Sequence, residues 1–274
     1  MKPVAFDYLH ARDLHQAAEA LARSAGAKII AGAQSLGPLL NLRLARPELL
    51  VDISRIGDIQ RIEETDTLWR IGAGVTHAQL EDLGDRLVGA QMMSDVAAQI
   101  AYRSVRNRGT IGGSLVHADP AADWPLALAA MDAIVVLQGS SGSEQRVAAD
   151  SFMLAAFITV LAQDEIVTAI EVPKRGRETR YGYFKFCRKT GDFPESNAAV
   201  VVDPGRSSRI FIGALSRAPQ PLPRLAEAVS RDGMRAATAE ATIAAVAAAA
   251  PEMDVPDVRM HAASVRHAIE QALR

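Results

Sequence analysis

The chain has 274 residues, of which 49% are hydrophobic, and its 30 basic and 32 acidic side chains give a formal net charge of −2. This size predicts two or three domains, and the near-neutral charge argues against a protein whose main task is to bind nucleic acid. The single cysteine, Cys187, excludes an intrachain disulfide. It also excludes an iron–sulfur cluster held by this chain alone, because such a cluster needs about four thiolate or imidazole ligands.

The sequence gives no sign of export or membrane insertion. Lys2, Asp7, His10 and Arg12 interrupt the first residues, where a signal peptide has a continuous apolar stretch. The longest apolar run, 241–250, is mostly alanine and is well short of the roughly 18 residues of a membrane-spanning helix. We therefore expect a cytoplasmic protein without a membrane span.

The first part of the chain is predicted to form a small α/β unit. Apolar residues at helical spacing predict an amphipathic helix over 8–25, which Gly26 ends. Next come a short strand over 28–30, a glycine-bearing loop, a helical turn over 39–43 and a second strand over 49–53. This order of elements is typical of an α/β unit.

The middle of the chain alternates strands and helices. A strand is predicted over 67–72, and a helix follows with Thr76 as its N-cap. Apolar residues on one face predict a helix over 94–108. After a second glycine-bearing loop, the sequence predicts a helix over 123–131 and a strand over 133–137.

The charged, turn-rich stretch at 173–178 predicts a domain boundary. Three strand-like runs joined by turns follow it, at 181–188, 197–203 and 209–215. They predict an antiparallel sheet. The remaining residues, from about 220 to 274, are rich in alanine and are predicted to form helices.

Two glycine-bearing loops, 31–36 and 110–115, carry the residues best suited to bind a ligand. Each combines small residues with a Ser or Thr hydroxyl. Small residues let the backbone approach a ligand, and several N–H groups can converge on phosphate oxygens. Together the loops can hold a diphosphate without a basic side chain, although one such loop alone is more often a plain turn. Neither contains GxGxxG or GxxxxGK[ST], so Rossmann-type nicotinamide binding is not supported.

Long stretches of the sequence resemble one known family. AGAQSLGPLLNLRLARPELLVDIS (31–54), IGAGVTHAQL (71–80) and TIGGSLVHADPAADWPLALAAMDA (110–133) closely resemble the FAD-binding medium subunit of molybdenum hydroxylases. That family includes the medium chain of aerobic carbon monoxide dehydrogenase and the flavin part of xanthine dehydrogenase. YGYFKFCRKTGDFP (181–194) resembles the start of the family's C-terminal domain, so the resemblance covers essentially the whole chain.

The resemblance implies an α+β fold in two parts. The first is an FAD-binding region of the vanillyl-alcohol-oxidase-like (PCMH) type over 1–175, with subdomains over about 1–57 and 58–175. The second is a C-terminal flavoprotein domain over 178–274, with a three-stranded antiparallel sheet and helices.

The resemblance also implies where the FAD diphosphate lies, which is against backbone amides of the two glycine-bearing loops. His117 lies beside the second loop, where it can touch flavin or phosphate. No acid–base catalytic residue and no metal ligand is expected. The residues implied for this part of the site are Ile29, Ile30, Ala31, Gly32, Ala33, Gln34, Ser35, Leu36, Thr110, Ile111, Gly112, Gly113, Ser114 and His117.

Four further residues match cofactor-binding positions of the family. Asp119 and Asp123 match acidic positions that face the ribityl or adenosine part, where a carboxylate accepts hydrogen bonds from sugar hydroxyls; Asp123 is equally suited to stabilise the start of a helix. Leu161 matches a position whose backbone meets the isoalloxazine ring, although an apolar residue before a turn also fits plain core. Lys185 matches a lysine close to the flavin, where a cation stabilises negative charge, although its strand position also fits a solvent face.

The chain departs from the family at Ala33. The family usually has two glycines where this chain has Gly32 and Ala33. The extra methyl group narrows the approach to the diphosphate, or is harmless if Ala33 has a negative φ. Cys187, between an aromatic and a basic residue, is interpreted as a small buried hydrophobe.

The implied function is electron transfer on FAD. By resemblance, a large partner oxidises a substrate at a molybdenum cofactor, a small partner relays electrons through two [2Fe–2S] clusters, and this chain passes them from FAD to NAD, a quinone or oxygen. The expected assembly is a heterotrimer or a dimer of heterotrimers. Two alternatives stay open: a stand-alone flavin oxidase of the vanillyl-alcohol type, and an interaction scaffold without a cofactor.

Overall fold

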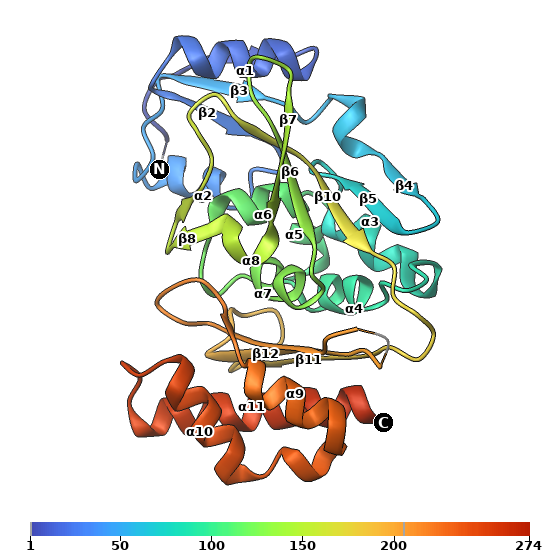
Figure 1. The fold of residues 1–274 in the computed structure, drawn as a ribbon. Coiled ribbons are helices and arrows are strands. Elements are labelled where there is room, and N and C mark those ends of the chain that lie inside the picture. The colour runs from blue at the N-terminus through green and yellow to red at the C-terminus, as the bar shows by residue number, and fades with distance from the viewer. Residues whose placement is uncertain (1, 205) are drawn as a thin grey trace.

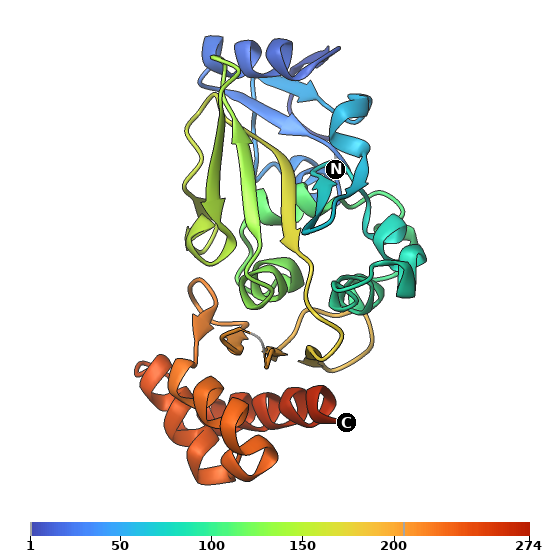
Figure 2. The same ribbon diagram turned by 45° about the vertical axis from the view of Figure 1, so that its right-hand side comes forward.

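The computed structural model describes residues 2–204 and 206–274. Figure 1 shows three parts stacked along the molecule: a small N-terminal sheet with its helix, a larger central sheet, and a C-terminal sheet covered by helices. The view turned by 45° in Figure 2 shows the same order. The N-terminal part therefore lies at one end of the molecule and the C-terminal part at the other.

The N-terminal sheet is parallel, with strand order β1-β3-β2. Helix α1 packs on β2 and β3 through buried Ala17, Ala18 and Leu21. Its elements are β1 (Asp7–His10), α1 (Leu14–Arg23), β2 (Ala27–Ile30), α2 (Leu36–Asn41) and β3 (Leu49–Asp52).

The helix predicted over 8–25 is wrong at its start. Residues 8–10 belong to β1, which pairs with β3. The helix begins at Leu14, because the Asp13 side chain accepts a hydrogen bond from the Gln16 amide at 2.8 Å and caps it. The predicted strands over 28–30 and 49–53 agree with the structure to within one residue.

The central sheet is antiparallel, with strand order β4-β5-β10-β6-β7. Its middle strand, β10, is almost continuously buried. The predicted strands over 67–72 and 133–137 correspond to β5 and β6. The strands are β4 (Ile62–Glu64), β5 (Leu68–Gly72), β6 (Ile134–Gln138), β7 (Glu144–Ala148) and β10 (Ile166–Pro173).

The helices around this sheet correct two predictions. The helix expected over 94–108 is interrupted, because Ala101 has φ 42° and the chain turns between α4 and α5. The expected loop over 110–115 is mostly helix α6. The elements are η1 (Gly57–Gln60), α3 (His77–Leu83), η2 (Gly84–Arg86), α4 (Met92–Gln99), α5 (Arg103–Arg106), α6 (Ile111–His117), α7 (Asp123–Ala130), α8 (Ala149–Phe152), β8 (Met153–Ala155) and β9 (Ile158–Thr159).

The C-terminal sheet is antiparallel with order β11-β12-β13-β14, one strand more than the three expected. The additional strand, β14, has two residues, too few to be recognised from a pattern. The elements are β11 (Arg180–Phe186), β12 (Ser196–Val202), β13 (Arg209–Gly213), β14 (Gln220–Pro221), α9 (Pro223–Asp232), η3 (Gly233–Ala236), α10 (Ala239–Ala249) and α11 (Val255–Leu273).

Both faces of the C-terminal sheet are covered. The helices α9, α10 and α11 lie on one side, and α4 and α7 lie on the other, between this sheet and the central one (Figure 2). Buried Tyr183, Val201 and Phe211 of the sheet belong to the same apolar cluster as Trp124 of α7. The central and C-terminal parts therefore share a packed core.

Candidate cofactor-binding site

The first glycine-bearing loop follows β2 at the carboxyl end of the parallel sheet. Ile29 and Ile30, the last residues of β2, pair with β3 and lead into the loop. Within residues 2–204 and 206–274, no acceptor receives a hydrogen bond from the amides of 32–35. The Gln34 side chain donates to the Gly32 carbonyl at 3.1 Å, and the exposed Ser35 hydroxyl makes no capping bond to α2. This loop therefore offers consecutive N–H donors and a hydroxyl to a ligand.

Ala33 adopts a left-handed conformation, with φ 61°. For a residue with a Cβ this conformation costs about 1–2 kcal/mol. Ala33 therefore lacks the negative φ that would make its methyl group harmless. The backbone at this position has the conformation that glycine adopts freely.

The second segment is the N-terminal turn of α6, with Thr110 as its N-cap. The amides of residues 111–114 are engaged within the protein, in contrast to the expectation that they face the diphosphate. The Ser114 hydroxyl makes no hydrogen bond to another described side chain or backbone atom. The Ile111 amide donates to the Val75 carbonyl at 3.0 Å, and the Gly112 amide donates to the Ala73 carbonyl at 2.9 Å. The Gly113 amide donates to the Thr110 hydroxyl at 3.1 Å, and the Ser114 amide donates to the Thr110 carbonyl at 3.0 Å.

The two glycines of this turn have different surroundings. A Cβ on buried Gly112 would lie 2.5 Å from the Ala73 Cβ, so glycine is required for α6 to pack against Ala73, the residue that follows β5. Gly113 is exposed, and only the Thr110 hydroxyl, at 2.8 Å, would contact a Cβ there. Gly112 serves packing, and Gly113 leaves an open backbone surface.

The first loop lies against residues 108–109, which lead directly into the second segment. A Cβ on Gly32 would lie 2.0 Å from the Arg108 carbonyl oxygen and 3.0 Å from the Gly109 Cα. Only a residue without a side chain permits this approach. The structure therefore brings together the two segments that sequence reasoning paired.

Asp123 and Lys185 form a buried ion pair. The Lys185 Nζ lies 3.1 Å from the Asp123 carboxylate, and the two side chains are 4% and 6% exposed. The Tyr183 hydroxyl also donates to Asp123, and Lys185 Nζ donates to the Gln99 carbonyl at 3.3 Å. Burial raises the pKa of Asp123, which the Lys185 charge opposes. Lys185 is thus not on a solvent face, and the N-cap of α7 is Ala122, not Asp123.

The remaining predicted residues make local contacts. The Asp119 carboxylate accepts the Ala121 amide at 2.9 Å, which stabilises the turn before α7. The Leu161 amide donates to the Thr159 hydroxyl at 3.3 Å. The His117 ring lies 5.3 Å, between centroids, from the ring of Phe157.

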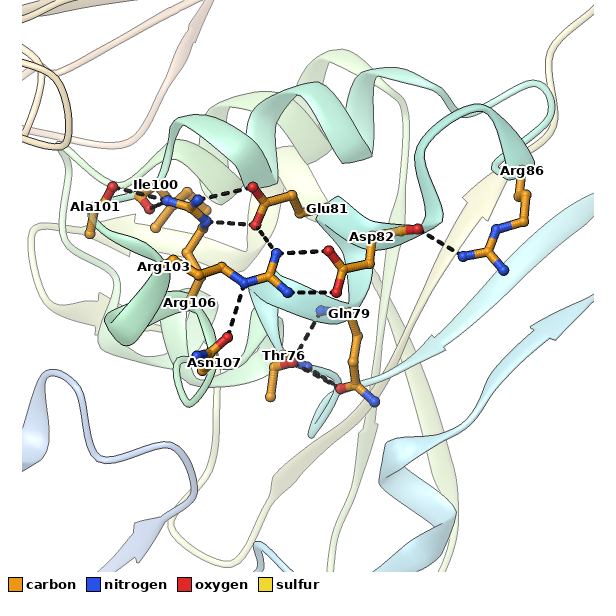
Figure 3. Close-up of polar contacts among 10 residues, drawn as sticks. All are labelled: Thr76, Gln79, Glu81, Asp82, Arg86, Ile100, Ala101, Arg103, Arg106 and Asn107. Carbon is orange, nitrogen blue, oxygen red and sulfur yellow. Dashed lines mark hydrogen bonds and ion pairs between the residues drawn. The ribbon is translucent and has the colours of Figure 1, made fainter.

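A network of charges fixes the segment that leads into α6 (Figure 3). Arg106 binds both oxygens of Glu81, at 2.8 and 2.9 Å, and also donates to two carbonyls in the turn between α4 and α5. Arg103 donates to Glu81 and to both oxygens of Asp82. Bidentate pairs of this kind fix geometry as well as adding energy, so α5 is held against α3.

Sequence reasoning missed two polar clusters next to the binding segments. Trp124 donates a hydrogen bond to His77 at 3.1 Å in the buried interior. Asp52 accepts hydrogen bonds from the Tyr8 hydroxyl and lies 3.3 Å from His10. His77 lies within a stretch that carries the family resemblance, but its spacing alone gives no role. The cluster around Asp52 was missed because β1 was predicted to be helix.

Comparison with known proteins decides the family. A family model described as the FAD binding domain in molybdopterin dehydrogenase matches residues 4–175. The chain belongs to this family. FAD is therefore the cofactor of the domain that these residues form.

Relatives and solved structures agree with the family. The alpha subunit of the 6-hydroxypseudooxynicotine dehydrogenase complex of Paenarthrobacter nicotinovorans is 39% identical over 219 residues, which cover 78% of this chain and 74% of that protein. The nicotine 6-hydroxylase medium subunit of the same organism is 33% identical over 277 residues, covering 100% of this chain and 96% of that subunit. The solved structure of reconstituted CO dehydrogenase from Oligotropha carboxidovorans matches with a TM-score of 0.92 at 29% identity, over 99% of both chains.

The described residues provide neither a candidate membrane span nor a candidate metal site. None of the helices they form combines the length and apolar character required to span a membrane. They also contain no group of three or more His, Cys, Asp or Glu side chains placed to hold a metal ion.

Proposed function

We propose that this chain is the FAD-binding, electron-transferring medium subunit of a molybdenum-containing hydroxylase or dehydrogenase. The observation that carries the proposal is the row of unengaged amides at 32–35, held against the segment that leads into α6. Neutral N–H donors of this kind suit the oxygens of a diphosphate. Membership of an FAD-binding family makes FAD the ligand that they fit.

In this proposal the first loop binds the diphosphate through its amides and the Ser35 hydroxyl. The second segment contributes the Ser114 hydroxyl and the open backbone at Gly113, while its engaged amides keep α6 in place. When bound, FAD supplies the redox chemistry, because its ring system accepts and releases electrons. We keep Asp119, His117 and Leu161 as proposed contacts, each supported by the family resemblance.

We propose that Asp123 holds the Lys185 ammonium group in place and that this fixed charge acts on the cofactor. An ammonium group held by a buried carboxylate and a backbone carbonyl has a fixed place, and a fixed charge stabilises negative charge nearby without reorganisation. The chain's own residues therefore orient the cofactor and tune its surroundings. No acid–base catalysis on a substrate is assigned to this chain.

The proposal includes partner subunits. The relatives are named as a subunit of a dehydrogenase complex and as a medium subunit. A chain with one cysteine cannot hold iron–sulfur clusters alone, so we propose a large molybdenum-cofactor partner and a small iron–sulfur partner in a heterotrimer or its dimer. We also propose a cytoplasmic location, and a division into an FAD-binding region over 1–175 and a C-terminal domain over 178–274, supported by the family match at 4–175.

Equilibrium dialysis of the purified full chain with FAD tests the proposal. We expect saturable binding of FAD that denaturation releases. A well-folded chain that binds no FAD would support the scaffold, and flavin that stays with the denatured protein would support a covalent flavin oxidase. Co-expression with the neighbouring genes provides a second test, because the proposal predicts a purified complex that contains molybdenum and iron.

A further inference from the structure

The buried side chain of His77 lies where the two proposed FAD-binding segments meet. It is 5% exposed, and the His77 backbone amide donates to the Gly109 carbonyl at 2.9 Å. A Cβ on Gly109 would lie 2.9 Å from both Cδ2 and Nε2 of the imidazole, so the ring edge rests on the Gly109 Cα. The same Cα lies 3.0 Å from the Cβ position of Gly32. The imidazole and the first loop therefore contact the same short segment, 108–109.

Trp124 fixes the orientation of this ring. The indole N–H donates to the His77 Nδ1 at 3.1 Å, and Trp124 is fully buried. An Nδ1 that accepts a hydrogen bond carries no proton, so a neutral imidazole has its proton on Nε2. Two helices, α3 and α7, are thus joined at the position where the backbone enters α6.

We propose that His77 is a positioning residue for FAD: held by Trp124, its imidazole fixes segment 108–109 and so sets the first loop and α6 at the spacing that the diphosphate requires. The inference rests on the proposed function and deepens it, because His77 lies outside both binding segments. Substitutions at Gly32 and Gly109 would break the same contact by steric overlap, whereas the His77 ring acts through van der Waals contact with Gly109, in the orientation that its hydrogen bond with Trp124 sets.

The charged groups around His77 keep its ring neutral. Burial, with the Arg106 guanidinium as the second cause, lowers the pKa of His77 from 6.5 to about 4. Arg106 of α5 is paired with Glu81 of α3, and Asp123 of α7 is paired within its own buried cluster. Protonation would turn Nδ1 from an acceptor into a donor, so it could no longer accept the hydrogen bond from the Trp124 N–H. Acid is therefore expected to loosen the contact at 108–109.

The test compares substitutions that remove or keep the acceptor, measured as FAD affinity of the purified full chain at neutral pH. His77→Ala is expected to weaken FAD binding about tenfold or more, the equivalent of one lost buried hydrogen bond. His77→Asn places an amide oxygen near the position of Nδ1 but lacks the ring edge that rests on Gly109, so it is expected to weaken FAD binding less than His77→Ala does. Trp124→Phe removes the donor and is expected to weaken binding in the same direction.

His261 offers a matched control. It is also a buried helix residue, at 2% exposure, and its ring nitrogens contact the carbonyls of Asp257 and Gly213 in the C-terminal part. His261→Ala is expected to lower the melting temperature while FAD affinity stays within about twofold of wild type, because additive effects hold for distant sites. This control separates positioning of the cofactor from general stability.

The pH profile provides a readout that packing alone does not change. Because the folded chain protonates His77 only near pH 4, the FAD affinity of the wild type is expected to fall as the pH is lowered from about 5 to about 3.5, and that of His77→Asn to show a shallower fall. Folded His77→Ala protein with wild-type affinity would overturn the inference, and so would an equal loss in His261→Ala. If His77→Ala does not fold, wild-type affinity in Trp124→Phe overturns it. A wild type that binds no FAD overturns the proposed function as well, which distinguishes the two failures.

Discussion

The two glycine-bearing segments differ in what their backbone amides do. In the first loop the amides of 32–35 donate to no acceptor among the described residues, whereas those of 111–114 are all engaged. Both segments combine glycine with a hydroxyl residue, so their sequences suggest the same role. The structure separates the roles: the first loop presents donors, and the second supplies a rigid support with a hydroxyl and an open backbone surface. Similar composition therefore does not imply similar hydrogen bonding, because an N-cap such as Thr110 turns a glycine-rich stretch into a helix.

The largest expected effect comes from breaking the contact between the two segments. Gly32→Ala places a Cβ 2.0 Å from the Arg108 carbonyl oxygen, so the backbone must shift. We expect a loss of about 3 kcal/mol or more in the free energy of unfolding, together with loss of FAD binding. Urea denaturation and FAD dialysis measure the two effects.

Gly37→Ala is the matched control for this substitution. Gly37 lies in α2, and a Cβ there would meet the Ala33 Cβ at 3.8 Å, an ordinary van der Waals distance. We expect unchanged or slightly higher stability, since alanine favours helix. Similar losses in both variants would show that the close contact between the segments is not the cause.

The second effect is acid destabilisation through His77. Its folded-state pKa is about 4 and its ordinary value is 6.5, so between these values the unfolded chain binds the proton that the folded chain does not. Stability therefore falls as pH decreases through this window, by about 3 kcal/mol in total, and this contribution levels off below it. Urea denaturation at several pH values, compared between wild type and His77→Asn, isolates the effect. Parallel profiles would contradict it.

The third prediction distinguishes the roles of the two glycines of α6, Gly112 and Gly113. Gly113→Val puts a branched side chain on the exposed backbone surface, and we expect FAD affinity to fall at least about tenfold with about 1 kcal/mol or less lost in stability. Gly112→Ala, which overlaps Ala73, is expected to lose more stability than Gly113→Val. Undiminished FAD binding in a folded Gly113→Val protein would remove the second segment from the site.

Local sequence signals predicted much of the fold. Thr76 was expected to cap a helix, and it forms a full capping box with Gln79 at the start of α3. The family and its cofactor, identified from long continuous motifs, are confirmed by the family match. The strand β1 was missed because its stability depends on pairing with β3, about 40 residues further along the chain, and no local pattern records that partner.

The site was less predictable, because its key contacts join distant residues. Lys185 and Asp123 are 62 positions apart in sequence. From its local sequence alone, Lys185 fits the solvent face of a strand and Asp123 fits the start of a helix. The amides of Ile111 and Gly112 donate to carbonyls in another segment, 73–75. The replacement of glycine at Ala33 is visible in the sequence, but its φ is not, because the conformation of the loop is imposed by its contacts.

The smallest effect, and the one that acts on the first loop alone, is expected from Ala33→Gly. The left-handed conformation at φ 61° costs alanine about 1–2 kcal/mol, and glycine adopts it freely but loses more conformational entropy on folding. The net gain in stability is therefore expected to be about 1 kcal/mol or less, with FAD affinity equal to or higher than that of wild type because a methyl group leaves the loop. Thermal unfolding with and without FAD measures both effects. A loss of stability would mean that the alanine methyl makes a packing contact worth more than the strain, and the first loop would then be held in shape by Ala33 itself, independently of the support from α6.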